Sequence, residues 1–142
     1  MNAITPPPNF PSLWVGIGCQ KGSSRKLIAT AIETVFQQHQ LPENAIAGLA
    51  TIDNKASEIG LTEFCRLHNF PLKIFSADIL ATVPVPNPSK IPQKTVGTPS
   101  VAEAAAILAA SHITPDLGII LVPKHIFRLQ GELGAVTIAV AC

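Results

Sequence analysis

The segment Leu13-Trp-Val-Gly-Ile-Gly18, together with the helix-forming segment that follows it, decides the fold of this chain. Its six residues form a short apolar run that ends in glycine, which is typical of a buried β-strand. Ser23 or Ser24 can then cap a helix that runs to about His39. Apolar residues recur in adjacent pairs every four positions along that helix and form one wide face. The pattern predicts a strand–helix unit of an α/β domain.

The same alternation continues along the rest of the chain. The sequence predicts further strands at 46–52, 71–75, 117–122 and 136–140, and helices at 61–68, 77–80 and 101–110. Continuously apolar strands are expected to be covered on both faces. We therefore predict a three-layer α/β/α domain with a mostly parallel sheet of about five strands. No clear helix separates the last two strands, which favours an antiparallel last strand at or near an edge.

Composition limits the partners of the chain. With 142 residues it suits one domain, and we expect a proline-rich flexible leader over residues 1–12 and a single domain over 13–142. Hydrophobic residues make up 47% and charged residues 13%, and the net charge is +1. This balance gives no general attraction to nucleic acid or to an anionic membrane surface, so we predict neither as a partner.

Cysteine usage and the N-terminus predict a cytoplasmic location. The three cysteines form no C-x-x-C pair, and their odd number argues against a complete disulfide framework. The N-terminus lacks the basic start and apolar core of a secretion signal, and no apolar run reaches the length of a transmembrane helix.

Polar and basic residues concentrate where the predicted strands end. Because the carboxyl ends of parallel strands share one edge of a sheet, this edge is the expected ligand site. The candidate binding residues in these loops are Gly18, Cys19, Lys21, Gly22, Ser23, Ser24, Thr51, Asp53, Lys55 and Lys124.

The loop after the first strand is the strongest of these candidates. Its glycines and lysine do not match the G-x-x-x-x-G-K-[ST] phosphate loop. Backbone N–H groups at a helix start, with Lys21 and Arg25 nearby, still favour an anion site, and the alternative is an ordinary strand-to-helix turn. Cys19 precedes the helix and lies near Lys21, which predicts a lowered thiol pKa. Since no histidine is placed as its base, a small buried side chain is the favoured interpretation.

A second helix start follows the proline-rich segment 83–99. Ser100 and Glu103 have the spacing of a capping box, in which each side chain accepts one backbone N–H. The exposed N–H groups of such a helix attract a negatively charged ligand, and the alternative is a well-capped helix without one. The candidate binding residues here are Gly97, Thr98, Ser100, Val101 and Glu103.

Three carboxylates at the predicted edge are candidate general bases, namely Asp53, Glu58 and Glu103. Asp53, Lys55 and Glu58 also fit a local turn with a salt bridge. The histidines have no spacing typical of metal ligands, so the sequence predicts no metal site and no bound cofactor.

Five of these motifs occur in an order that resembles the CobE family, equivalent to the C-terminal domain of CbiG, of cobalamin (vitamin B12) biosynthesis. They are Gly16-Ile-Gly-Cys-Gln-Lys-Gly22, Ala50-Thr-Ile-Asp-Asn-Lys55, Val85-Pro-Asn-Pro-Ser89, Val96-Gly-Thr-Pro-Ser-Val-Ala-Glu-Ala104 and Leu121-Val-Pro-Lys124. The resemblance spans residues 13–140. It implies a compact α/β domain that acts in corrin ring construction on a precorrin, a tetrapyrrole rich in carboxylates.

The resemblance leaves three roles open. Full-length CbiG proteins open the lactone ring of cobalt-precorrin-5A and release acetaldehyde, whereas this chain resembles the freestanding CobE form. It is expected to bind or hand on a corrinoid intermediate, to act in the hydrolase with a separate N-terminal portion, or to dock without catalysis on another enzyme of the pathway. The basic residues available to a carboxylate-rich ligand are Lys21, Arg25, Lys55, Lys90 and Lys124.

Overall fold

The computed structural model describes residues 12–55, 57–83, 85, 101–111, 119–132 and 134–142. In chain order the elements are β1 (Leu13–Cys19), α1 (Arg25–Gln38), η1 (Glu43–Ala45), β2 (Ile46–Ile52), η2 (Asp53–Lys55), α2 (Ile59–His68), β3 (Leu72–Phe75), α3 (Ala77–Leu80), α5 (Val101–Ser111), β4 (Ile120–Phe127) and β5 (Val136–Ala141). Most strands and helices begin and end within two residues of their predicted bounds. None of the helices in these ranges is long and apolar enough to cross a membrane.

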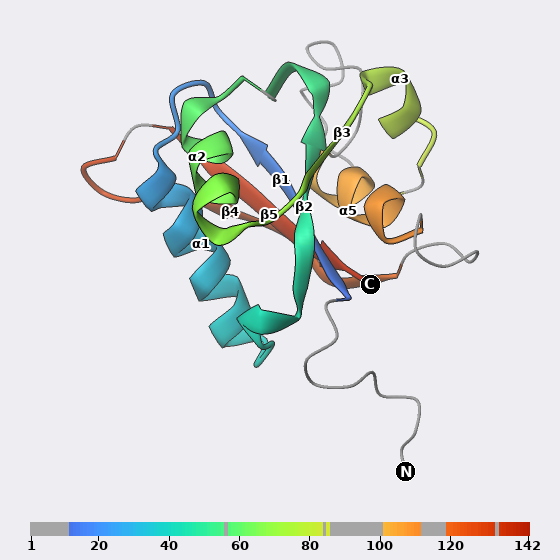
Figure 1. Ribbon diagram of the computed structural model, residues 1–142, viewed down its shortest axis with the longest axis horizontal. Helices are drawn as coiled ribbons and strands as arrows, with labels where there is room; N and C mark the ends of the chain where they lie inside the picture. Colours follow the sequence, from blue (N-terminus) through green and yellow to red (C-terminus); the bar gives the residue numbers. More distant parts are fainter. Residues whose placement is uncertain (1–11, 56, 84, 86–100, 112–118, 133) are drawn as a thin grey trace.

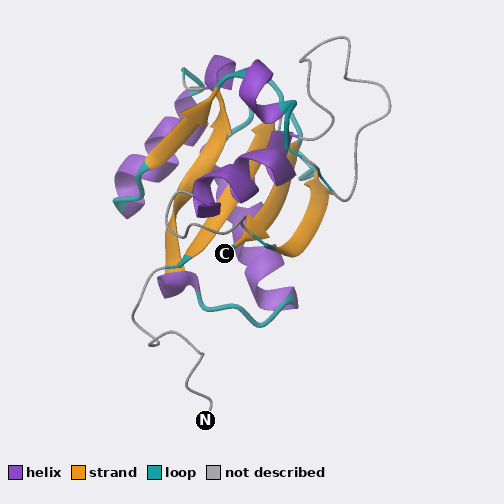
Figure 2. Ribbon diagram, turned by 90° about the vertical axis from the view of Figure 1, so that its right-hand side faces the viewer, coloured by secondary structure: helices purple, strands orange, loops and turns teal. Residues whose placement is uncertain are grey.

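The strands form one sheet in the order β3-β2-β1-β5-β4. β1, β2 and β3 pair in parallel, and β5 runs antiparallel to both of its neighbours, so β4 has the same direction as β1. Helices α1 and α2 cover one face of the sheet, and α5 covers the other (Figure 1). Figure 2 shows α5 lying across the strands on its own face. The predicted three-layer domain with an antiparallel last strand is confirmed.

The last strand lies near an edge of the sheet, as predicted, because β5 is the second strand from that edge and lies between β1 and β4. Val136, Ile138 and Val140 project into the core on the α1 side and are fully buried. On the opposite face β5 presents small side chains such as Ala139, which allow α5 to pack closely. An internal position removes more apolar surface of such a strand from solvent than an edge position does. This burial explains why β5 lies between two strands.

The fourth strand does not end at Pro123 as predicted. β4 continues to Phe127 and forms an edge of the sheet, where the missing N–H of a proline need not remove a ladder hydrogen bond. The pairing with β5 shifts between Val122 and His125, so that Pro123 and Lys124 fall in a bulge. Lys124 therefore lies within the strand, before the carboxyl edge of the sheet.

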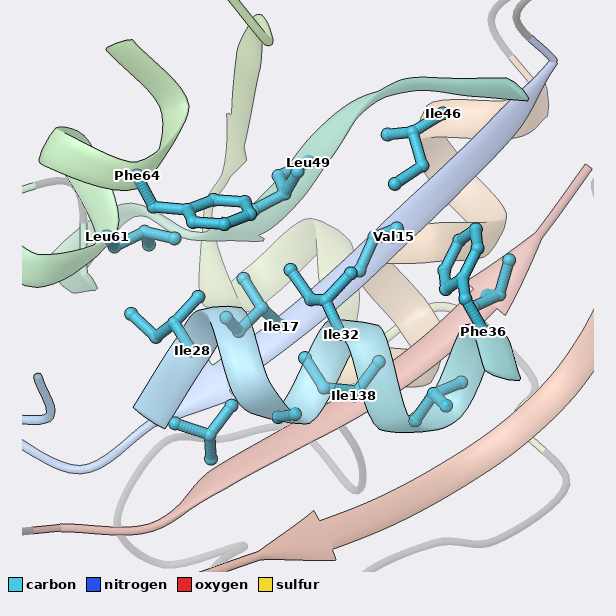
Figure 3. Close-up of a cluster of buried hydrophobic side chains, with 14 of the residues drawn as sticks. Val15, Ile17, Ile28, Ile32, Phe36, Ile46, Leu49, Leu61, Phe64 and Ile138 are labelled. Atoms are coloured by element: carbon cyan, nitrogen blue, oxygen red, sulfur yellow. The ribbon is translucent and has the colours of Figure 1, made fainter. Parts of the chain in front are cut away.

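Two apolar clusters hold the layers together. One fills the space between the sheet and helices α1 and α2, where Ile32 and Phe36 of α1 meet Val15 and Ile138 of the sheet (Figure 3). The other lies under α5 and consists largely of alanines. A side chain at Gly16 would overlap the backbone of α5, so this glycine sets how closely the helix approaches the sheet.

The carboxyl ends of β1 and β2 are also joined by a side-chain hydrogen bond. The fully buried Thr51 hydroxyl donates to the Ile17 carbonyl at 2.6 Å. We expect Thr51→Val to lower the free energy of unfolding by about 1–2 kcal/mol, because it leaves a buried carbonyl without this donor. Thr51→Ser retains the hydroxyl and is expected to lose less. Urea denaturation of both variants checks the difference, and equal losses would contradict it.

Candidate functional site

A cavity of about 520 Å³ opens where the loop after β1 meets the start of α2. Both segments follow the carboxyl ends of parallel strands, as the sequence predicted. The residues that line it are Lys21, Gly22, Ser23, Ser24, Arg25, Ser57, Glu58, Ile59, Gly60 and Glu63. The lining combines two cations, two carboxylates, hydroxyl groups and one strongly exposed apolar side chain, Ile59.

Ser23 fixes the shape of the loop between β1 and α1. It is 3% exposed, and its hydroxyl lies 2.8 Å from the Gln20 carbonyl oxygen and 3.3 Å from that of Ala135. Gly60 and Gly134 leave room for this arrangement, because a side chain at either position would overlap Ser23. Gly22 has a φ of 83°, a backbone conformation that favours glycine. The loop is therefore held by α2 on one side and by the segment before β5 on the other.

The donors of this loop are engaged by carboxylates of the protein itself. The Gly22 N–H donates to Glu58 Oε1 at 2.9 Å. Ser24 is the N-cap of α1, accepts the Leu27 N–H at 3.0 Å and donates its own hydroxyl proton to Glu132. The Gly22 N–H and the Ser24 hydroxyl are thus already bonded to carboxylates of the chain, and binding of an anionic ligand by this loop stays a prediction.

Cys19 lies at the end of β1 with Lys55 and Glu58 close enough to act on its charge. Burial raises the pKa of the Cys19 thiol from 9.0 to about 11, while the Lys55 ammonium lowers this pKa and the Glu58 carboxylate raises it. The predicted lowering of the pKa is therefore wrong, because desolvation outweighs the nearby positive charge. Asp53, in η2, is exposed to solvent.

We expect Cys19 to be a poor nucleophile at pH 8. A raised pKa in the folded state keeps the thiol protonated, and the stability that this proton contributes is lost as the pH rises from about 9 through about 11. A thiol-specific disulfide reagent should modify the exposed Cys142 rapidly and Cys19 far more slowly. Comparison of the wild type with Cys142→Ser checks this, and rapid labelling of the folded Cys142→Ser protein would contradict it.

The start of α5 lies beside the end of β1. Val101 side-chain atoms lie 3.8 Å from the position that a Cβ at Gly18 would occupy. Gly97, Thr98 and Ser100 lie outside the described residues, so the capping box stays a prediction. Glu103 is fully buried, and its Oε2 accepts the Lys124 N–H at 2.9 Å. This bond joins α5 to the bulge of β4, where Lys124 lies between the register pairs of Val122 and His125 with β5.

The structure thus gathers most of the candidate residues at one edge. The carboxyl ends of β1 and β2 bring together the loop 18–24, Thr51, η2 and Val101. Lys124 lies apart from them, in the middle of β4 and before its carboxyl end. The sequence analysis missed Glu63 and Glu132, whose contacts with the loop depend on packing between distant segments. Within the ranges that the structure describes, no group of three or more histidine, cysteine or carboxylate side chains could hold a metal ion.

The structure is an α/β domain whose polar loops gather at the carboxyl edge of the parallel strands, the edge at which sheets of this class commonly bind ligands. The chain belongs to the CbiG_C family, described as the cobalamin synthesis G C-terminus, whose model matches residues 13–141. The resemblance noted in the sequence is confirmed, and with it a place among the proteins of cobalamin biosynthesis.

Two curated relatives are each named cobalt-precorrin-5A hydrolase. The protein from Priestia megaterium is 30% identical over 129 residues, which are 91% of this chain and 32% of the relative. The protein from Salmonella typhimurium is 31% identical over 94 residues, which are 66% of this chain and 27% of the relative. The chain therefore spans about a third or less of the length of these relatives.

Two solved structures share the fold across nearly their whole length. CobE, a protein from the cobalamin biosynthetic pathway, matches with a TM-score of 0.80 and 27% identity, covering 96% of this chain and 97% of CobE. The cobalamin biosynthesis protein chiG from Agrobacterium tumefaciens matches with a TM-score of 0.64 and 27% identity, covering 91% and 96%. The chains in both structures are of about the size of this chain.

Proposed function

We propose that this chain binds a carboxylate-rich corrinoid intermediate of cobalamin biosynthesis at the carboxyl edge of its sheet. The main observation behind the proposal is the cavity at this edge, which Lys21 and Arg25 line. Close to them, the Gly22 N–H and the Ser24 hydroxyl already donate hydrogen bonds to carboxylates of the chain. A polycarboxylate needs such cations and N–H or O–H donors. A macrocycle also needs apolar contact, and Ile59, which is 71% exposed, offers it at the same place.

The size and charge of the site agree with this ligand class. A volume of about 520 Å³ lies within the range of small-molecule sites, roughly 300–1,000 Å³. Because the net charge of the chain is only +1, attraction for an anion depends on local groups. Lys55, next to Cys19, adds a further cation at the same edge.

The test is a titration with hydrogenobyrinate followed by visible absorption. We expect saturable binding at micromolar concentration, weakened about tenfold in the double variant Lys21→Ala/Arg25→Ala, because each cation contributes about 0.5–1 kcal/mol at an exposed site. Lys26→Ala, an exposed lysine one residue further along α1, is the matched control and is expected to bind like the wild type. Absence of any spectral change at high micromolar ligand would contradict the proposal.

A second candidate function is supported by the two relatives named cobalt-precorrin-5A hydrolase. In this role the chain would be one component of the hydrolase and would act with a separate N-terminal portion. Of the three candidate bases, Glu58 and Glu103 are hydrogen-bonded to backbone N–H groups, whereas Asp53 is exposed at the edge. Asp53 is therefore the residue that we assign to activation of water.

Release of acetaldehyde from cobalt-precorrin-5A tests this second candidate. The chain is assayed alone and together with the N-terminal portion of a full-length relative. Acetaldehyde formed only by the combination, and lost with Asp53→Asn, supports the role as a hydrolase component. No release in either assay rejects it while leaving corrinoid binding to be decided by the titration.

A further inference from the structure

Three residues in the β1–α1 loop and at the start of α1 each contact a carboxylate from a distant part of the chain. The Gly22 N–H donates to Glu58 at 2.9 Å, the Ser24 hydroxyl donates to Glu132, and Arg25 Nη1 lies 3.9 Å from Glu63 Oε1. These acids come from the turn before α2, from the β4–β5 connection and from α2 itself. Groups suited to a ligand carboxylate are therefore already occupied in this structure.

We propose that Glu58 is an internal competitor of the ligand: its carboxylate occupies the Gly22 N–H that a ligand carboxylate takes, and it moves away when the ligand binds. This inference rests on the proposed corrinoid binding and adds an autoinhibitory contact to that site. The substrate class is a polycarboxylate, since an anion of the same kind replaces the Glu58 side chain on this donor with a charge-assisted hydrogen bond of similar strength.

The position of Glu58 in α2 allows this movement. Glu58 is the N-cap residue of α2, yet among the described residues its side chain makes no capping hydrogen bond to its own helix. It reaches across to Gly22 instead, in a solvent-exposed contact. Ser24 differs, because its hydroxyl oxygen caps α1 through the Leu27 N–H. Displacement of the Glu58 side chain therefore breaks no helix cap, and the freed carboxylate can be hydrated.

The charges lining the cavity support the same conclusion. Lys21 and Arg25 are balanced there by Glu58 and Glu63. A ligand carboxylate that entered with Glu58 in place would meet a like charge at hydrogen-bonding distance. Exchange of the two carboxylates removes this repulsion and keeps the Gly22 N–H satisfied. A ligand with neutral amide side chains forms no charge-assisted bond with this N–H and gains less from the exchange.

The test compares the wild type with Glu58→Ala and the nearly isosteric Glu58→Gln in the hydrogenobyrinate titration. We expect Glu58→Ala to bind about threefold to tenfold more tightly, the factor that corresponds to one hydrogen bond of ordinary net strength. Glu58→Gln is expected to bind more tightly by a smaller factor, because its uncharged amide oxygen can still accept the Gly22 N–H. Glu43→Gln removes the same charge from the exposed turn η1 at the other end of β2, and it is expected to change nothing. An amidated corrinoid, whose carboxylates are carboxamides, is expected to show little gain with either variant.

The outcomes distinguish the competitor role of Glu58 from corrinoid binding itself. Wild-type binding with unchanged or weaker binding by both Glu58 variants overturns the competitor role and leaves corrinoid binding standing. Tighter binding of the amidated and the carboxylate ligand by equal factors also overturns it, because the effect would not depend on carboxylate exchange. No binding by any of the proteins overturns the proposed function and this inference together. Melting temperatures of the three variants establish that each is folded.

Discussion

Gly16→Ala is expected to destabilise the protein by about 3 kcal/mol or more, because among the described glycines a Cβ added here makes the shortest contact. A Cβ at this position would overlap the Ala102 carbonyl oxygen and lie 2.9 Å from the Ala106 Cβ. Both atoms belong to α5, and a backbone carbonyl cannot rotate away as a side chain can. The helix would have to lift from β1, and the alanine-rich cluster beneath it would lose its close packing.

Gly18→Ala is the matched control, because it places the same methyl group on the same strand two residues further along. The nearest atom to a Cβ there is a Val101 side-chain carbon at 3.8 Å, an ordinary van der Waals contact. We expect a change of less than about 1 kcal/mol. Urea denaturation gives the free energies of unfolding of both variants. Similar values would show that α5 does not pack against β1 as closely as the Gly16 contact indicates.

Glu103→Ala is expected to cost about 2–3 kcal/mol. The Glu103 carboxylate is fully buried and accepts the Lys124 N–H in the bulge of β4. Its removal leaves a polar backbone group without this acceptor and a void beneath α5. The structure therefore gives this glutamate a role in joining α5 to the edge strand.

Glu103→Gln separates the acceptor from the charge. The amide oxygen can still accept the Lys124 N–H, so a smaller loss of stability is expected than for alanine. Thermal unfolding of the two variants measures the difference. If both lose the same amount, the hydrogen bond to Lys124 is not what stabilises the contact. If neither is destabilised, the assigned joining role is wrong.

Features that depend on neighbouring residues could be predicted from the sequence. Ser24 caps α1 as expected, because capping is decided by a hydroxyl and the N–H three residues later. The strand at 46–52 has its predicted bounds, since a continuous apolar run between polar turns leaves little choice. The gathering of loops at one edge follows from the parallel order of β1 and β2.

Features that depend on packing could not be predicted. Whether β4 passes through Pro123 is decided by its place at the edge of the sheet, which no local pattern reveals. The pKa of Cys19 is set by burial under segments far away in the sequence. The contacts Gly22–Glu58 and Ser24–Glu132 join residues 36 and 108 positions apart. Local spacing carries no information on such pairs.

The most direct test of corrinoid binding at this edge is a two-dimensional ¹H–¹⁵N NMR titration with metal-free hydrogenobyrinate, which leaves resonances free of paramagnetic broadening. We expect the largest amide shifts at the carboxyl edge, on Gly22, Arg25, Lys55 and Gly60. Shifts confined to the opposite end of the sheet, around η1 and the start of β2, or no shifts at saturating ligand, would contradict it.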